Sequence, residues 1–321
     1  MRRTGQEMVG CYDKNIRNTL IILLFFILWS SPVFSQTIAA TDDLGFKLEL
    51  KTCPQRIVSL APNLTEILFA LGLGNELVGV TRFCDYPPEA RTKTTVGGLV
   101  DPSLEIIQAL KPDLVLAFRG NPRNLLERLR SLSLPVFAFE QGHSFEDLFL
   151  LIERIGKLTC REKAAEELVK KMKQEISATE MVVARRASGQ KVFLTVHGQG
   201  NGLWTCGRES FLNYLLEKAG VKNIASDAPG NWLAITQEEI IAGNPDIILI
   251  LARDEEAFRR ARQSILSHPA FRNIEAVRQG KIFFLEENIF SRFGPRLVEA
   301  YRLLVHVLHP ELFEPRERSS T

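Results

Sequence analysis

The sequence lacks an excess of charge of either sign. Its 321 residues carry 40 Lys and Arg against 38 Asp and Glu, a formal net charge of +2. Proteins that bind nucleic acid through its phosphates usually carry a clear basic excess, so the sequence argues against that class. With 45% apolar and 24% charged residues, the composition is that of a folded globular chain, and its length suits two modest domains.

The sequence also lacks the common motifs of nucleotide-binding and hydrolytic enzymes. It contains no G-x-x-x-x-G-K loop, no G-x-S-x-G elbow and no H-E-x-x-H. Residues 198–202 are glycine-rich, but their third glycine comes one position too early for a dinucleotide loop, and Leu203 and Trp204 stand where a helix should begin. We therefore predict no catalytic residues, no enzyme activity and no cofactor. An exported α/β enzyme is the alternative hypothesis.

No apolar run is long enough to span a membrane comfortably, which takes roughly 20 residues. Residues 20–29 (LIILLFFILW) form a shorter run that matches the core of a secretory signal, about 7–15 residues long. Val33 and Ser35 are small residues at the third and the last position before a cut after Ser35, and no cysteine stands close behind the run, where a lipoprotein would carry its lipid. We predict a cleaved signal peptide over residues 1–35 and a periplasmic mature protein, with an uncleaved signal anchor as the alternative.

Export would place the remaining cysteines in an oxidising compartment. Beyond the signal segment lie Cys53, Cys84, Cys160 and Cys206. Four cysteines allow three pairings, among which the sequence does not choose. Free thiols are the alternative, because a chain of this size does not need disulfides to fold. The cysteine spacing matches no zinc site, and we predict no metal site.

Short apolar runs alternate with helical segments along most of the chain. Such alternation indicates a parallel sheet covered by helices on both faces. Residues 160–186 interrupt it with one long helical stretch that contains neither glycine nor proline, and a strand over residues 191–196 resumes it. In the first half we predict strands over residues 56–60, 77–80, 114–117 and 136–138, and helices over residues 63–71, 104–110 and 124–131.

The second half of the sequence echoes the first. Residues 104–117 (LEIIQALKPDLVLA) match residues 237–250 (QEEIIAGNPDIILI) at one constant offset. A looser match joins residues 65–79 to residues 210–225 in the same order, which favours duplication. The stronger match aligns Glu105 with Glu238, Pro112 with Pro245, and Asp113 with Asp246.

The repeat predicts an α/β fold of two Rossmann-like lobes with parallel sheets, joined by one long backbone helix, with a ligand cleft between the lobes. The predicted segments are a signal peptide (1–35), an N-terminal extension (36–51), an N-terminal lobe (52–158), a linker helix (159–188), a C-terminal lobe (189–313) and a tail (314–321).

Several segments resemble the substrate-binding proteins of ABC importers, in the class with a helical backbone. They are residues 56–66 (RIVSLAPNLTE), residues 84–90 (CDYPPEA) with 96–98 (VGG), and residues 104–115, which end in LKPDLV. The resemblance covers about residues 53–312, and the Asp-Tyr-Pro-Pro element is most similar to the cobalamin-binding branch of the family.

This resemblance implies a protein that captures a corrinoid (cobalamin) and delivers it to a membrane permease driven by an ATPase, and that is a monomer when free. The alternative within the same fold is a receptor for haem or an iron–siderophore. The resemblance also implies that Glu105 and Glu238, one on each lobe, dock into arginine pockets of the permease. Each is expected in the first turn of a helix, where the alternative is that it only complements the helix dipole, a gain of about 0.3–1 kcal/mol.

Residues that follow the predicted strands are the candidates for the ligand site, because ligands of parallel α/β sheets bind beyond the carboxyl ends of the strands. A corrinoid is a large apolar macrocycle edged by amides, so aromatic walls with a few polar groups are expected. The predicted ligand-binding residues are Phe83, Asp85, Tyr86, Leu99, Phe118, Arg119, His197, Trp204, Trp232, Phe290 and Arg292.

Three of these candidates, Phe83, Leu99 and Phe118, depart from the Trp or Tyr that the cobalamin branch can carry. Core packing is the alternative for any single aromatic, and for Phe118 above all. His197 is predicted to be polar lining rather than a metal ligand. His306 and His309 are predicted to be a surface pair rather than a shared metal site.

Overall fold

The computed structural model describes residues 37–184, 189–196 and 203–313. The predicted signal peptide, the last residues of the predicted linker, His197 and the predicted tail lie outside the described residues. The described helices and strands belong to one compact unit that begins at Ile38. Within these ranges, no helix is both long and apolar enough to cross a membrane.

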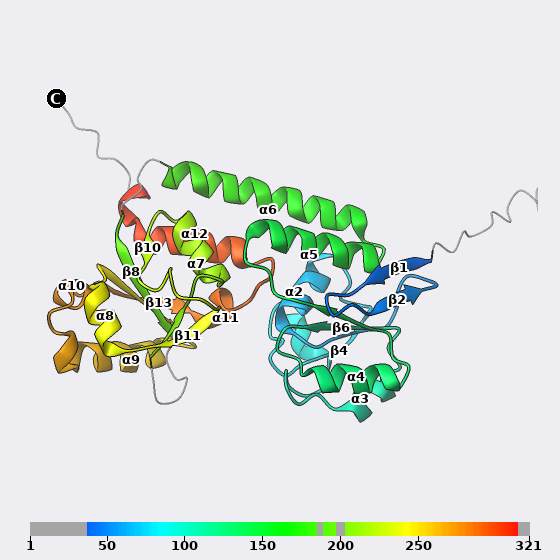
Figure 1. Ribbon diagram of the computed structural model, residues 1–321. Coiled ribbons are helices and arrows are strands. Elements are labelled where there is room, and N and C mark those ends of the chain that lie inside the picture. Colours follow the sequence, from blue (N-terminus) through cyan, green and yellow to red (C-terminus); the bar gives the residue numbers. More distant parts are fainter. Residues whose placement is uncertain (1–36, 185–188, 197–202, 314–321) are drawn as a thin grey trace, which may run out of the picture. The chain divides into compact units, whose positions relative to one another are not determined.

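The N-terminal lobe is built on a sheet of five parallel strands in the order β5-β4-β3-β6-β7 (Figure 1). Strand β6 (Leu114–Phe118) is buried along its whole length, and alternate residues enter different apolar clusters: Leu116 joins one and Val115 the other. Helices therefore cover both faces of the sheet, as the alternation predicts. The other elements of this lobe are β3 (Ile57–Ser59), β4 (Leu77–Val80), β5 (Thr94–Thr95), β7 (Val136–Phe139), α2 (Pro62–Ala70), the 3-10 helix η1 (Pro88–Thr92), α3 (Leu104–Ala109), α4 (Arg123–Ser131) and α5 (Phe145–Leu158).

The C-terminal lobe repeats this arrangement with four parallel strands in the order β10-β8-β12-β13. Strand β12 (Ile247–Ala252) is also buried throughout and sends Leu249 and Ile250 into different clusters. The structure thus confirms the predicted α/β fold with parallel sheets. The other elements are β8 (Lys191–Val196), β9 (Leu203–Cys206), α7 (Phe211–Lys218), β10 (Lys222–Asn223), β11 (Trp232–Ile235), α8 (Gln237–Gly243), α9 (Glu255–Ser267), η2 (Pro269–Phe271), α10 (Glu275–Arg278), β13 (Ile282–Glu286), α11 (Glu287–Phe290), α12 (Leu297–Leu308) and η3 (Pro310–Leu312).

One local contact recurs in both lobes at the positions that the sequence echo aligns. The Asp113 carboxylate accepts hydrogen bonds from the backbone N–H groups of Gln55 and Arg56, each at 2.8 Å. The Asp246 carboxylate accepts one from the backbone N–H of Lys191 at 2.8 Å. In each lobe the aspartate therefore joins the start of one central strand to the start of its neighbour.

The linker helix α6 (Glu162–Val183) is slightly shorter than the predicted stretch of residues 160–186. It lies along α5 and α12 (Figure 1). Its far end is bound to the C-terminal lobe, where Lys218 Nζ lies 2.8 Å from Glu180 Oε1. The helix is therefore attached to elements of both lobes along its length.

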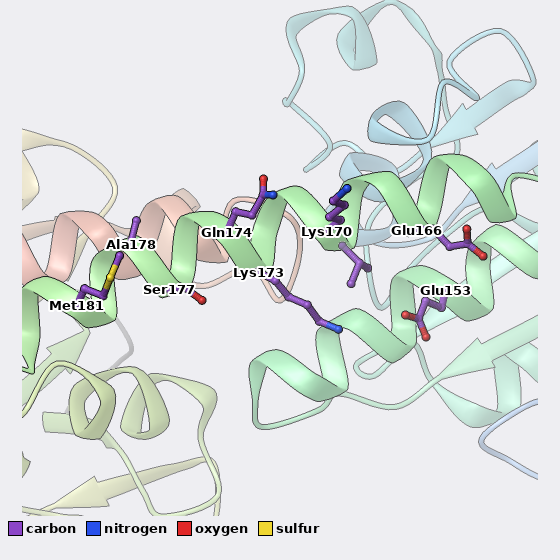
Figure 2. A pocket seen from close by; sticks show the side chains of 9 residues that line it. Glu153, Glu166, Lys170, Lys173, Gln174, Ser177, Ala178 and Met181 are labelled. Carbon is purple, nitrogen blue, oxygen red and sulfur yellow. The ribbon is translucent and has the colours of Figure 1, made fainter.

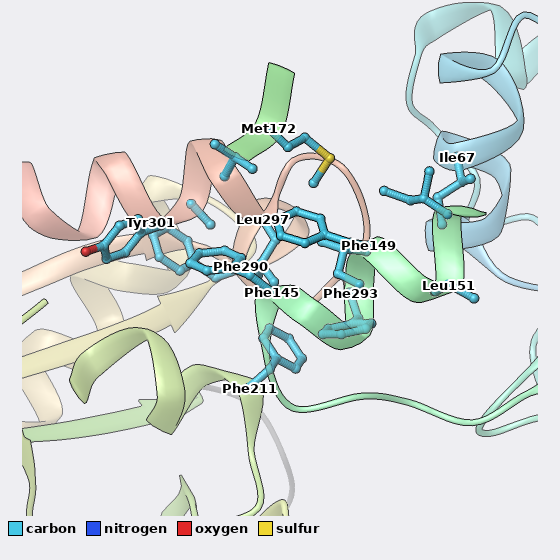
Figure 3. Close-up of a cluster of buried hydrophobic side chains, with 14 of the residues drawn as sticks. Ile67, Phe145, Phe149, Leu151, Met172, Phe211, Phe290, Phe293, Leu297 and Tyr301 are labelled. Atoms are coloured by element: carbon cyan, nitrogen blue, oxygen red, sulfur yellow. The ribbon is translucent and has the colours of Figure 1, made fainter. Parts of the chain in front are cut away.

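A single apolar cluster contains side chains from both sheets and from α5, α6 and α12 (Figure 3). The ring of Phe145, at the start of α5, packs edge-on against Tyr214 and Tyr301, with ring centroids 5.5 and 5.6 Å apart. Both tyrosines belong to helices of the C-terminal lobe. The two lobes thus share one core, and the linker lies on it.

The predicted N-terminal extension forms a hairpin of β1 (Ile38–Thr41) and β2 (Lys47–Leu50). Asp42, 5% exposed, accepts hydrogen bonds from the backbone N–H groups of Leu44 and Phe46 at 3.0 and 2.8 Å and shapes the turn. The same carboxylate pairs with Arg130 and accepts from the backbone N–H of Ala138 at 3.2 Å. The hairpin is therefore attached to the edge of the N-terminal sheet.

The structure shows which of the four cysteines form a disulfide, which the sequence leaves open. Cys53 and Cys160 form a disulfide with their Cα atoms 5.8 Å apart. Cys84 and Cys206 are free thiols, and both are buried. The disulfide joins the segment before β3 to the turn between α5 and α6, so it fastens the linker to the N-terminal lobe.

Candidate functional site

Two tryptophans stand on one face of a short antiparallel ribbon in the C-terminal lobe. Trp204 in β9 is the direct partner of Ala234, and Trp232 lies two residues earlier on β11, so both indoles project to the same side. Each is 37% exposed, which is a large apolar area to leave in water. Neither β9 nor β11 is among the strands predicted from the sequence, because strands that pair across a long stretch of chain leave little local pattern in either segment.

These indoles line a cavity of about 310 Å³. Its other walls come from the carboxyl ends of the parallel strands, the edge where ligands of such sheets bind. Val196 ends β8, Leu251 lies near the end of β12, and Glu287 follows β13 directly. Ser291 completes the lining. The cavity is thus an apolar pocket with one carboxylate and one hydroxyl, and the sequence analysis missed its Glu287.

A buried ion cluster joins helix α2 of the N-terminal lobe to the segment before α12. Glu66, 3% exposed, lies 3.0 Å from Arg292 Nη1 and accepts two hydrogen bonds from Arg296, at 3.1 and 2.7 Å. Arg292 also pairs with Asp85 at 2.7 Å. The Arg296 guanidinium carbon lies 4.1 Å from the centre of the Tyr86 ring, within cation–π range. The predicted residues Asp85, Tyr86 and Arg292 are therefore brought together.

Glu66 is the carboxylate that pairs with both arginines of this cluster. Burial alone would lower the pKa of Arg296, but the hydrogen bond and the negative charge of Glu66 outweigh it and raise that pKa. In the sequence, Glu66 stands out only as the last residue of the motif 56–66, and Arg296 is not among the predicted site residues. The one pattern in the sequence that points to this cluster is the spacing of Arg292 and Arg296, which lie four residues apart.

A second set of polar contacts connects the lobes at the loop before β11. With its amide oriented so that both ends are satisfied, Asn231 accepts a hydrogen bond from Arg119 Nη1 and donates one to the backbone oxygen of Glu209, each at 2.9 Å. His143 Nδ1 bonds the same Glu209 oxygen. Arg119 and His143 follow β6 and β7, so the N-terminal lobe contacts two loops of the C-terminal lobe, the one before β11 and the one before α7, which Asn231 and Glu209 join to each other.

The remaining predicted ligand residues differ in their exposure. Phe83 and Tyr86 are 46% and 44% exposed and free to contact a ligand. Leu99 is half-buried against the main core, and Phe118 is 8% exposed and part of that core, the alternative that the sequence analysis favours for it taken alone. Phe290 is only 1% exposed, so its side chain is not available to a ligand, and we leave it out of the proposed site.

The histidine pair near the C-terminus is not a surface pair, which corrects that prediction. His309 is 2% exposed, and its Nε2 lies 2.8 Å from the backbone oxygen of Ala219. His306 instead packs against the ring of Phe313. Among the residues that the structure describes, no group of three His, Cys, Asp or Glu side chains is placed to hold a metal ion.

A larger hollow, of about 600 Å³, lies along the linker (Figure 2). It is lined by Glu153 of α5 and by residues of α6, among them Glu166, Lys170 and Lys173. None of the predicted ligand residues lies there. Of the two cavities, the smaller one combines exposed indoles with the strand ends.

Glu105 and Glu238 occupy equivalent positions on the two lobes. Each is the second residue of its helix, α3 or α8, behind a hydroxyl cap from Ser103 or Thr236. Both side chains are exposed, and no ion pair involving either occurs among the described residues. The neighbouring Glu239 instead folds back onto Thr236 in a capping box, which lowers the pKa of its carboxyl through the backbone and side-chain hydrogen bonds of Thr236.

Comparison with known proteins places this geometry in a family. The sequence profile of the family described as "Periplasmic binding protein" matches residues 57–289. An uncharacterised ABC transporter substrate-binding lipoprotein of Bacillus subtilis, YvrC, is 31% identical over 88% of this chain and 88% of its own length. The vitamin B12-binding protein of Pectobacterium carotovorum is 30% identical over 77% of this chain and 86% of its own.

Among solved structures, the chain is similar to the periplasmic haem-binding protein RhuT of Roseiflexus in its apo form. The TM-score is 0.73 at 26% identity, over 80% of this chain and 99% of the other. These proteins share the family or the fold with this chain, and they are named for different ligands, vitamin B12 and haem.

Proposed function

The chain belongs to the periplasmic binding protein family, and from that premise we propose that it captures a corrinoid outside the cytoplasm and delivers it to the permease and ATPase of an ABC importer. The observation that carries the proposal is the cavity with the exposed Trp204 and Trp232 at the strand ends. A corrinoid offers a wide apolar surface edged by amides, which suits indole walls with a few polar groups. The vitamin B12-binding relative supports this ligand class.

In this proposal the exposed side chains of both lobes line one ligand site. The C-terminal lobe supplies Trp204 and Trp232, and the N-terminal lobe supplies Phe83, Tyr86 and Arg119. Arg292 acts indirectly, because its guanidinium holds the carboxylate of Asp85. His197, which directly follows Val196 in the sequence but lies outside the described residues, stays a predicted ligand residue.

Titration with cyanocobalamin, haem and a ferric hydroxamate tests the ligand. We expect cyanocobalamin to bind and to quench tryptophan fluorescence, and replacing Trp204 or Trp232 by alanine to weaken binding by about tenfold or more, as loss of a central aromatic contact does. The matched control is Phe46→Ala, which removes an aromatic side chain that is 45% exposed on the N-terminal hairpin. Tight binding of haem or the hydroxamate without binding of cyanocobalamin would replace the corrinoid assignment, and turnover of a bound compound would favour the enzyme hypothesis.

We also propose that Glu105 and Glu238 dock the protein onto basic sockets of the permease. Two exposed carboxylates at equivalent helix starts can steer and orient such a contact. A purely structural role would be expected to use the carboxylate within its own helix, as Glu239 does. The absence of ion partners for Glu105 and Glu238 among the described residues agrees with a role toward another molecule.

Charge reversal tests the docking. The double variant Glu105→Lys, Glu238→Lys should reduce transport by about tenfold or more, because like charges facing each other across an interface repel strongly, while ligand affinity stays unchanged. The control is Glu153→Lys, Glu166→Lys, the same change of charge at one exposed position of α5 and one of the linker α6. Transport that survives in the first variant, or is lost equally in the second, would remove the docking role from these two residues.

A further inference from the structure

The cavity beside the tryptophans contains a carboxylate with no visible partner. Glu287 lines the cavity together with Val196, Trp204, Trp232, Leu251 and Ser291. Among the described residues, no ion pair or side-chain hydrogen bond involves the Glu287 carboxylate. With a volume of about 310 Å³, the cavity is smaller than a corrinoid or a haem, so it receives one part of such a ligand.

The arginines nearest in sequence to this cavity are already engaged. Arg292, directly after Ser291, is buried and bonded to Glu66 and Asp85. Arg296 is bonded to both oxygens of Glu66. Within the described part of the chain, no cation pairs with Glu287. The pocket therefore offers a ligand one negative charge between apolar walls, where a charge acts more strongly than in water.

We infer that Glu287 determines which side group a ligand can place in this cavity: it accepts a hydrogen bond from an amide N–H or a hydroxyl and excludes a carboxylate. The inference rests on the proposed role of the cavity as a ligand site. A corrin ring is edged by carboxamides, which donate to Glu287, whereas haem carries two propionates, which the carboxylate repels. A polar group in such a pocket rejects a ligand that leaves it without a hydrogen-bond partner or that brings a like charge to it. Glu287 thus favours amide-edged ligands over acid-edged ones.

Ligands that differ by one group test this inference directly. The probes are cyanocobalamin and its monocarboxylic acids, in each of which one peripheral amide is hydrolysed to a carboxylate. We expect at least one of these acids to bind the wild-type protein about tenfold or more weakly than cyanocobalamin at pH 7. In Glu287→Gln that difference should fall to about twofold, because the glutamine accepts or donates without charge. Glu286→Gln, which removes the neighbouring exposed carboxylate outside the cavity, should keep the difference.

Failures of the inference and of the proposed function are distinguishable. If the wild-type protein binds cyanocobalamin and all its acids equally, the inference is overturned while the corrinoid function stands; this comparison needs no variant to fold. If the difference persists in Glu287→Gln, the inference is likewise overturned. If the wild-type protein binds haem and not cyanocobalamin, the proposed function fails, and haem with both propionates amidated becomes the probe. Tighter binding of that diamide than of haem then supports the role of Glu287, and equal binding overturns it.

Discussion

Replacing Glu66 by glutamine should destabilise the folded protein by about 3–5 kcal/mol, because removing one partner of a buried ion cluster leaves an uncompensated buried charge. The Glu66 side chain is 2% exposed, and those of Arg292 and Arg296 are 9% and 13% exposed. Arg292 keeps Asp85, but Arg296 loses its carboxylate partner. The cost therefore comes chiefly from Arg296, whose charge would be left with the Tyr86 ring and a backbone oxygen of Asn288.

Denaturation in urea, followed by circular dichroism, measures this loss. The control is Asp101→Asn, which breaks the ion pair of Asp101 with Arg82 on the surface, where both side chains are about half exposed, 57% and 49%. An exposed pair contributes little to stability, so the control should keep the wild-type midpoint. A Glu66→Gln protein as stable as the control would show that the buried cluster does not hold the fold together.

The same substitution should also disturb the N-terminal side of the proposed ligand site. Glu66 positions Arg292, which in turn holds Asp85, and it positions Arg296 under the ring of Tyr86. Beside this cluster, Asn63 donates a hydrogen bond to the backbone oxygen of Phe293 at 3.2 Å, so α2 contacts the segment before α12 at two points. Stability and the shape of the site therefore depend on one buried carboxylate.

The sequence predicts the fold well where local pattern decides it. The strand predicted over residues 114–117 is β6 (Leu114–Phe118), because a run of apolar residues between a proline and a glycine has few other options in a parallel sheet. The linker predicted over residues 160–186 is α6 (Glu162–Val183), because its Ala, Glu and Lys residues favour helix without help from packing.

The sequence does not predict the role of a residue that depends on a contact with a residue far along the chain. In the sequence, Glu66 resembles an ordinary helix glutamate. The structure pairs it with Arg292, which lies 226 positions later. Trp204 and Trp232 are predicted as ligand residues, yet the ribbon that aligns them depends on the pairing of β9 with β11, between which α7 and β10 intervene. Phe290 follows a strand as a ligand residue should, but the shared core of the two lobes takes it instead. Contacts between residues far apart in the sequence thus determine the details of the site, which the spacing of apolar residues and the composition do not predict.

Opening the Cys53–Cys160 disulfide should cost about 4–5 kcal/mol of stability, because the bond closes a loop with a sequence separation of 107 and removes that freedom from the unfolded chain. Among the four cysteines that the structure describes, a reducing agent acts on this bond alone, since Cys84 and Cys206 are already thiols. These two are also poor candidates for exchange with it. Burial raises the pKa of Cys84 despite hydrogen bonds from Thr65 and Thr81, and burial raises the pKa of Cys206 to about 12, so neither forms the reactive thiolate readily.

Urea denaturation of the mature chain with and without reductant measures the contribution of the bond. The matched variant is Cys53→Ala, Cys160→Ala, which should have the stability of the reduced wild-type protein and should not respond to reductant. Counting thiols in the denatured, unreduced wild-type chain gives an independent reading, because Cys84 and Cys206 alone should react. A wild-type protein that ignores reductant and exposes all four thiols on unfolding would contradict the pairing. A protein that keeps the pairing but loses much less stability would show instead that its unfolded chain is already compact, so that the bond restricts it less than a loop of this length implies.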